Sequence, residues 1–205
     1  MRTILLTFCL FMGTILSAQN NVLIEIENAN AAYKVITGDF VRTQTNVAKG
    51  TSIKADGTLY IVGEDQMTQH YKAPSTDLLI INGNDFYMIR GKKTNKFNTE
   101  KNKTMRSLRN TLLYCVHGKP MELATENGAE ITAEKKENEY EVVLISTKKT
   151  PRGYAKIVLT YDLKSKLLTK MRMDEYNGNS TLYEMNNLKT NGNIDAKVFD
   201  IPEKK

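Results

Sequence analysis

Asparagine followed by glycine occurs four times in the chain, and this pair constrains the fold more than any other feature of the sequence. The pairs are Asn82-Gly83, Asn127-Gly128, Asn177-Gly178 and Asn191-Gly192, with Asp56-Gly57 as a fifth candidate turn. Asn-Gly suits the positive φ angles of a two-residue hairpin turn. From Asp39 onward, short runs rich in Val, Ile, Thr, Tyr and Phe alternate with such turn residues. The pattern is typical of an antiparallel, mainly β protein.

The alternation predicts about ten strands. Two hairpins are clearest because strand-like residues flank the Asn-Gly turn on both sides: Thr76–Ile81 with Asp85–Arg90, and Met171–Tyr176 with Ser180–Met185. The other predicted strands are Asp39–Ala48, Thr58–Gly63, Met67–Tyr71, Ile131–Lys136, Glu139–Thr147, Tyr154–Tyr161 and Asp195–Phe199. A meander of this size is too large for a flat open sheet, so we expect the sheet to curl or to close.

Two amphipathic helices are predicted beside the strands. The first ends near Thr37-Gly38 and has apolar residues at helical spacing, namely Val22, Leu23, Ile26, Ala29, Tyr33 and Ile36. The second lies between Lys101 and His117, is stopped by Gly118 and Pro120, and has one apolar face formed by Met105, Leu108, Leu112, Leu113 and Val116. This second helix either fills the core of the curved sheet or covers a cavity that opens, and core filling is the more common role.

Residues 1–18 have the pattern of a secretory signal peptide. Arg2 supplies a positive charge, an apolar run extends from Ile4 to Leu16, and Ser17-Ala18 provides the small residues that precede cleavage. We therefore expect an exported, periplasmic protein with one domain over residues 19–205. The mature chain keeps a single cysteine, Cys115, so an intramolecular disulfide is impossible and stability must come from an apolar core.

The charge of the chain is dispersed. The formal net charge is +6, and loss of Arg2 with the leader reduces it to +5. Lysine and arginine are spread among 23 acidic residues. The densest basic stretch, Lys92 to Arg109, lacks the stacked aromatic residues that single-strand binders use, so nucleic acid is not an expected partner.

Residues that would carry catalysis or bind a metal do not form a recognisable motif. The sequence has only two histidines, and His117 follows Cys115 by two residues, a spacing that places them on different faces of a helix. Neither C-x-x-C nor H-E-x-x-H occurs, and the segment Asp174–Gly178 lacks the third-position oxygen ligand of a calcium loop. We expect a binding protein without enzymatic activity, metal or cofactor, in which Cys115 packs in the core.

Three segments together resemble the outer-membrane lipoprotein carrier family, which are periplasmic proteins that shield the acyl chains of lipoproteins. The matching residues are the leader and first helix followed by Gly38-Asp39-Phe40-Val41-Arg42, then Gly57–Ile61, Met67, Tyr71-Lys72-Ala73-Pro74 and Leu79–Tyr87, and finally Asp174 through Phe199. Two positions depart from the family pattern. Val62-Gly63-Glu64 replaces a basic residue before proline that is associated with closing the lid, and Gln69 replaces an aromatic residue.

The resemblance implies a strongly curved antiparallel sheet, an incomplete β-barrel, with helices covering its concave apolar face. It also implies a carrier that moves acylated lipoproteins from the inner to the outer membrane. The implied partners are an inner-membrane lipoprotein-releasing transporter and an outer-membrane acceptor. We expect the carrier to act as a monomer.

Successive side chains of a strand point to opposite faces of the sheet, and this alternation, which we call strand parity, predicts which residues face the cavity. Met67 faces inward at the matching family position, Tyr71 follows on the same face, and Leu59 and Ile61 are the neighbours on the adjacent strand. Five further residues are included although both faces of their strands carry apolar residues, so that parity does not choose their face. The complete predicted acyl-chain cavity is Phe40, Leu59, Ile61, Met67, Tyr71, Leu79, Ile81, Phe86 and Met88. The helix between Lys101 and His117 is the predicted lid.

Two other hypotheses remain beside the carrier. One is a non-catalytic envelope domain of the same fold that has a filled core and binds a protein partner or another lipid, and the other is a secreted hydrolase. An open apolar cavity beneath the second helix would favour the carrier, a solid core would favour the binding or sensor domain, and clustered carboxyl groups with shifted pKa values would favour the hydrolase.

Overall fold

Eleven strands form one antiparallel sheet in the computed structural model, which describes residues 19–149 and 153–201. The predicted signal peptide lies outside these residues. The strand order is β6-β5-β4-β3-β2-β1-β11-β10-β9-β8-β7, with β6 and β7 at the two edges, so the sheet is not closed into a barrel. The strands are β1 (Val35–Asn46), β2 (Thr51–Val62), β3 (Gln66–Tyr71), β4 (Leu78–Asn82), β5 (Asp85–Arg90), β6 (Lys93–Asn98), β7 (Ala129–Lys135), β8 (Glu139–Ser146), β9 (Tyr154–Asp162), β10 (Leu168–Glu175) and β11 (Ser180–Thr190).

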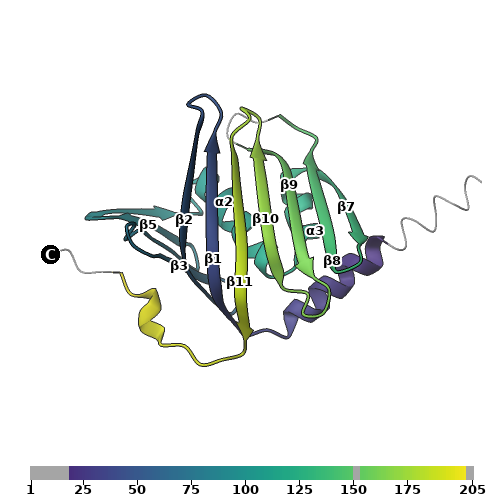
Figure 1. Ribbon diagram of the computed structural model, residues 1–205, viewed down its shortest axis with the longest axis horizontal. Coiled ribbons are helices and arrows are strands. Elements are labelled where there is room, and N and C mark those ends of the chain that lie inside the picture. Colours follow the sequence, from purple (N-terminus) through teal and green to yellow (C-terminus); the bar gives the residue numbers. More distant parts are fainter. Residues whose placement is uncertain (1–18, 150–152, 202–205) are drawn as a thin grey trace, which may run out of the picture.

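The chain path explains why helices cover one face of this sheet. Strands β1 to β6 run from the centre to one edge, and α2 (Lys103–Val116) and α3 (Pro120–Asn127) then carry the chain across to β7 at the other edge. Strands β7 to β11 return to the centre, where β11 pairs with β1. The sheet therefore curves around α2 and α3, which lie behind the strands in Figure 1. The expected curved antiparallel sheet with helices on its concave face is confirmed.

An N-terminal helix over residues 19–31 closes one end of the curved sheet (Figure 1). Ile26 of this helix is fully buried, and the Asn30 side-chain amide donates to the backbone oxygen of Lys166 at 2.8 Å. Glu25 forms a 2.8 Å ion pair with Lys166 and accepts a hydrogen bond from the Tyr140 hydroxyl. The predicted extension of this helix to Thr37-Gly38 is wrong. The β-branched run Val35-Ile36-Thr37 belongs instead to β1, because it pairs there with both β2 and β11.

The Asn-Gly pairs mark hairpin turns only where two strands flank the pair directly. Gly83 and Gly178 have φ angles of +56° and +86° in the β4–β5 and β10–β11 hairpins, as expected for Asn-Gly turns. Gly128 instead ends α3 in the left-handed conformation, and Asn191-Gly192 follows β11 without a strand after it. Asp56-Gly57 is not a turn, because both residues lie within β2.

Three further elements differ from the sequence prediction. Strand β6 was not predicted, since its residues read as part of a basic stretch. Helix α3 was not predicted either, because Pro120 occupies the first turn of a new helix, where its missing N–H is not needed. The predicted strand Asp195–Phe199 is wrong: the carboxylate of Asp195 accepts from the Lys197 backbone N–H and starts a 3₁₀ helix, η1 (Ala196–Phe199).

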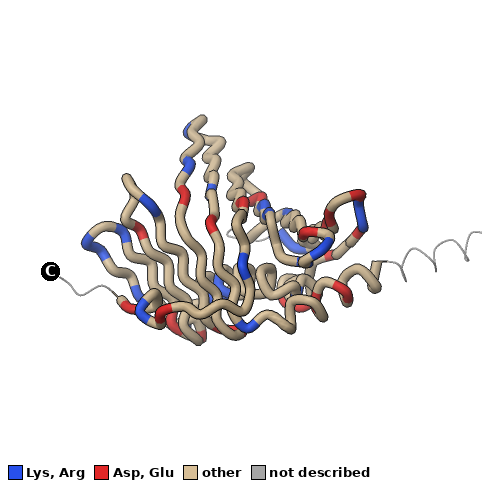
Figure 2. Tube along the Cα trace, turned by 60° about the horizontal axis from the view of Figure 1, so that its bottom comes forward, with Lys and Arg blue, Asp and Glu red and all other residues tan. Residues whose placement is uncertain are grey.

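The two faces of the sheet bury different groups of residues. A large apolar cluster lies on the concave face between the strands and α2, α3 and the N-terminal helix. A small cluster of Leu78, Ile80 and Ile89 lies on the other face of β4 and β5, where Phe199 of η1 packs against it. Figure 2 shows lysine and arginine positions distributed over strands, turns and helices with acidic positions among them, which agrees with the dispersed charge of the sequence. Among the described residues, no helix has both the length and the apolar character needed to cross a membrane.

Candidate functional site

The nine predicted cavity residues lie on one face of the sheet. Met67 is directly opposite Ile61 on β2 and Ile81 on β4, and the pairing continues across β4 and β5 through Ile81 with Phe86 and Leu79 with Met88. Directly opposite residues share a face of an antiparallel pair. All nine belong to, or pack against, the concave cluster, so the structure brings together every residue of the predicted cavity.

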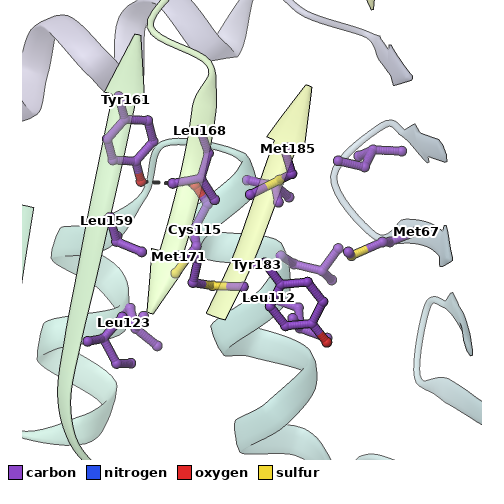
Figure 3. Packing of buried hydrophobic residues seen from close by; sticks show 14 of the residues in the cluster. Met67, Leu112, Cys115, Leu123, Leu159, Tyr161, Leu168, Met171, Tyr183 and Met185 are labelled. Carbon is purple, nitrogen blue, oxygen red and sulfur yellow. Dashed lines mark hydrogen bonds between the residues drawn. The ribbon is translucent and has the colours of Figure 1, made fainter. Parts of the chain in front are cut away.

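Helix α2 packs on this face, but unevenly along its length. Leu112, Leu113 and Val116 in its C-terminal half are at most 3% exposed, whereas Met105 and Leu108 in its N-terminal half are only partly buried. Figure 3 shows Leu112 and Cys115 of α2 among the side chains of the strands, including Tyr183 and Met171. The helix is therefore anchored at its C-terminal end and more loosely held at its N-terminal end.

Cys115 is part of the anchored half of α2. Its side chain is fully buried, burial raises the pKa of the thiol, and its backbone oxygen accepts a 2.9 Å hydrogen bond from the Tyr161 hydroxyl (Figure 3). The prediction that Cys115 packs in the core is confirmed.

Sequence reasoning missed the half of the concave face that β8 to β11 provide. Met171, Met173, Tyr183 and Met185 are all buried in the same cluster as the nine predicted residues. The signal was present, because these residues alternate with polar ones along Met171–Met185. The resemblance directed the cavity prediction to the N-terminal strands, and only the β1–β11 pairing joins the two halves into one face.

A pocket of about 530 Å³ opens beside the loosely held half of α2. We call it the side pocket. Its apolar wall is formed by Ala129, Leu144, Tyr154 and Ile157, and the first turns of α2 line it with Thr104 and Ser107. Burial raises the pKa of the Tyr154 phenol. Beneath the anchored half of α2, by contrast, the space between Leu59, Ile61 and Val116 amounts to about 10 Å³, so that part of the face is filled.

Polar groups on the concave face lie toward the end of β3. Gln69, which replaces an aromatic residue of the family pattern, is 2% exposed and its side-chain oxygen accepts a 3.2 Å hydrogen bond from the Tyr71 hydroxyl. Burial raises the pKa of the Tyr71 phenol, so this hydroxyl stays protonated and available as a donor. Phe40 packs edge-to-face against Tyr71, with ring centroids 5.0 Å apart.

The turn after β2 contacts the connection between α2 and α3. Gly63 has a φ angle of +57° in this turn, and the Glu64 carboxylate lies 3.2 Å from the Lys119 ammonium group. Glu64 lies in the turn between β2 and β3, and Lys119 lies between the two helices α2 and α3. The Glu64 side chain is largely exposed, so solvent screening weakens this ion pair and it contributes little to holding the turn against the helices.

The carboxyl groups with shifted pKa values do not form a cluster. A hydrogen bond from Lys166 lowers the pKa of Glu25, one from Asn187 lowers the pKa of Asp39, and one from Lys96 lowers the pKa of Asp85. Hydrogen bonds from Ser165 lower the pKa of Asp162. The four residues lie on the N-terminal helix, on β1, on β5 and at the end of β9. The described residues contain no group of three or more His, Cys, Asp and Glu arranged to hold a metal ion. The arrangement gives the hydrolase hypothesis no support.

His117, at the C-terminal end of α2, predicts a pH dependence of stability. Burial lowers the pKa of its imidazole and Lys119 lowers it further, while Glu64 acts in the opposite direction. The unfolded chain, with a histidine pKa of about 6.5, therefore binds a proton more tightly than the folded chain. The contribution of neutral His117 to the free energy of unfolding is therefore present above about pH 6.5 and is lost as the pH falls below this value.

We expect wild type to lose more stability than His117→Gln when the pH is lowered from about 8 to about 5.5, as measured by urea unfolding. Comparing the two proteins removes the contribution of all other titrating groups that they share. Equal losses in both would show that His117 does not carry this dependence.

Comparison with known proteins gives one family. The family model described as outer membrane lipoprotein carrier protein LolA matches residues 31–202. No curated protein matches the chain. Similar solved structures include an uncharacterized conserved protein from Thermus thermophilus, with a TM-score of 0.53 and 9% identity over 88% of this chain and 93% of that one.

Two other solved structures are similar at low identity. MucB has a TM-score of 0.53 and 9% identity, and the match covers 92% of this chain but 64% of MucB. A LolA superfamily protein from Nitrosomonas europaea has a TM-score of 0.45 and 8% identity over 90% of this chain and 98% of that one. At these identities, a structural likeness shows the fold alone.

Proposed function

The chain belongs to the outer membrane lipoprotein carrier protein family, and we propose that it is a periplasmic carrier that shields the acyl chains of lipoproteins and moves them from the inner to the outer membrane. In this proposal the concave face holds the chains and α2 is the lid. The family match supports the carrier class. We further propose an inner-membrane releasing transporter and an outer-membrane acceptor as partners, on the same basis, and a monomeric carrier.

The physical requirement for such a carrier is an apolar interior, and the acyl chains themselves need no specific polar contacts. Each exposed CH₂ group of an acyl chain costs about 0.8 kcal/mol in water, so a lipoprotein cannot cross an aqueous compartment unshielded. The concave cluster, with its methionines and aromatic residues, provides apolar surface that adapts to a chain of irregular shape. Such binding needs no catalytic group.

The observation that carries the proposal is the uneven packing of α2 beside the side pocket. The N-terminal half of α2 is partly buried next to about 530 Å³ of open space, while the C-terminal half fills the face. An acyl chain that entered at the side pocket would displace α2 from the N-terminal end. A lid that packs on the empty face also competes with cargo, which limits affinity and allows release.

One observation favours the second hypothesis, a binding or sensor domain of the same fold that recognises a protein partner or another lipid. Leu112, Leu113 and Val116 fill the concave face as core residues do. Mass spectrometry of material that co-purifies with the mature protein from the periplasm separates the two functions. Acylated lipoproteins support the carrier, and a non-acylated protein partner in their place supports the binding domain.

A direct binding test uses a synthetic diacylated lipopeptide and the variant Met88→Glu. Met67 is unsuitable for this test because it is 1% exposed, and a buried carboxylate there would destabilise the fold. Met88 is on the same face but partly buried, so a glutamate can reach water when the lid is closed and would oppose an acyl chain when it is open. We expect a loss of affinity of about tenfold or more, because a charge in an acyl-chain site must be desolvated.

The matched control is Ile145→Glu, since Ile145 is 51% exposed and alternates with the inward-facing Leu144 on β8. We expect this variant to bind the lipopeptide like wild type. Failure of wild type to bind would refute the carrier function. Equal affinities of the two variants would place the acyl chains away from Met88.

A further inference from the structure

Arg42 places a positive charge on the apolar concave face. It follows Phe40 at the inward-facing parity of β1, and the residues directly opposite are Ala55 on β2 and Tyr183 on β11. The guanidinium carbon lies 4.6 Å from the centroid of the Tyr71 ring, which stacks it against a residue of the predicted cavity. Arg42 is half-buried at this position, and a charge taken partly out of water is usually matched by an ionic partner or a hydrogen-bond acceptor.

Arg42 has no ionic partner within the described part of the chain. None of the ion pairs found there includes it, and its side chain makes no hydrogen bond to another described residue. Its Nε atom is buried and has no acceptor in the part of the chain that the structure describes. A buried donor that lacks an acceptor costs free energy, so the side chain gains from any ligand that brings one.

The surroundings of Arg42 are apolar on one side and cationic on the other. A hollow of about 30 Å³ connects it to Tyr71, Leu79 and Met88, three residues of the predicted cavity. Arg90 and Asp77 line the same hollow, and the Asp77 carboxylate is engaged by Arg90 at 3.9 Å. Two arginines and one aspartate leave this edge of the hollow net positive. The partly buried Met88 side chain is flexible and can yield to a larger group.

We propose that Arg42 binds the anionic head group of an amphiphile, a carboxylate or a phosphate, whose acyl chain lies on the concave face. The planar guanidinium matches both anions with two parallel N–H donors. The Tyr71 hydroxyl lies on the same face and can donate a hydrogen bond to the anion when its hydrogen bond to Gln69 breaks. This inference rests on the proposed function, since it requires an acyl chain on that face, and it adds that the cargo or a competing lipid carries negative charge next to its chain.

The test compares three ligands that share one chain: dodecanoate, dodecyl phosphate and dodecanol. Each is titrated against the delipidated mature protein at about pH 8, where the carboxylate is ionised. We expect wild type to bind the anions about tenfold more tightly than dodecanol, a difference of about 1.4 kcal/mol. Arg42→Met should lose this preference and keep its affinity for dodecanol, and Arg42→Lys should retain part of it because the charge remains without the planar fork.

Arg172→Met is the matched control, because Arg172 is exposed on the other face and pairs with Asp174 at 2.9 Å. It should keep the full preference for anions. If Arg42→Met does not give the wild-type circular dichroism spectrum, Arg42→Gln and the lysine variant replace it in the comparison.

The outcomes separate this inference from the function on which it rests. Equal affinities of wild type for all three ligands, or an anion preference that survives in Arg42→Met, would overturn the anion site while leaving acyl-chain binding in place. Failure of dodecanol and of the lipopeptide to bind would refute the carrier function itself. Tighter binding of dodecyl phosphate would identify a phospholipid-like head group as the source of the anion, and tighter binding of dodecanoate would identify a free fatty acid.

Discussion

Leu112→Ala is expected to lower the stability of the protein and, at the same time, to raise its affinity for an acylated lipopeptide. Leu112 is 1% exposed in the anchored half of α2, so its truncation should cost about 2 to 5 kcal/mol of unfolding free energy. If α2 is a lid, the same loss weakens the closed state with which an acyl chain competes, and affinity should rise about tenfold or more. Urea unfolding and lipopeptide titration measure the two effects.

The matched control for this experiment is Ile80→Ala. Ile80 is also 1% exposed, but it lies in the small cluster on the other face of β4, away from α2. The control should lose a similar amount of stability and bind the lipopeptide with wild-type affinity. If Leu112→Ala binds no more tightly than Ile80→Ala, α2 is a core helix rather than a lid, and the carrier mechanism proposed above is wrong.

Gly57→Ala is expected to destabilise the fold by about 3 kcal/mol or more. A Cβ atom at Gly57 would lie 2.1 Å from the backbone oxygen of His70 and 2.8 Å from the Phe40 ring. The first contact involves the backbone of the paired strand β3, which cannot move aside without breaking the β2–β3 register. Phe40 packs over the position that the missing side chain would occupy. The midpoint and slope of urea unfolding measure the effect.

Gly192→Ala is the control for this substitution, because a Cβ atom there has no neighbour within 4 Å. We expect it to leave the unfolding free energy within about 0.5 kcal/mol of wild type. A Gly57→Ala protein as stable as the control would mean that β2 and β3 do not approach as closely as described, and that Phe40 does not lie over Gly57.

The hairpins and helix α2 could be predicted because their signals are local. The strand β5 has the predicted bounds Asp85–Arg90, and α2 differs from the predicted helix Lys101–His117 only at its ends. Each hairpin combines an Asn-Gly turn with strand-like residues on both sides, and the apolar stripe of α2 repeats at helical spacing. Local signals failed at Ile36, where helical spacing continues but pairing with β2 and β11 decides the structure.

Strand parity placed Tyr71 on the same face as Met67, and Ile61 on the same face as Leu59, because side chains alternate strictly along a strand. Parity could not reveal the side pocket, which exists only because α3 ends at Gly128 and the chain continues into β7 beside the start of α2. It also could not reveal that Arg42 lacks an ionic partner among the described residues. An arginine in a strand is ordinary in a sequence, and its isolation depends on which carboxylates the folded sheet brings near it.

The sequence by itself therefore determined that the chain is an antiparallel, mainly β protein with an amphipathic helix between two sets of strands, and that Met67 shares a face with Tyr71 and Leu59 with Ile61. Turn geometry and the two periodicities are properties of neighbouring residues, so they can be seen in the sequence. Tertiary structure alone decided that β1 pairs with β11, that both halves of the sheet share one concave face, and that α2 is anchored at only one end. These features depend on contacts between residues far apart in the chain, which no local pattern specifies.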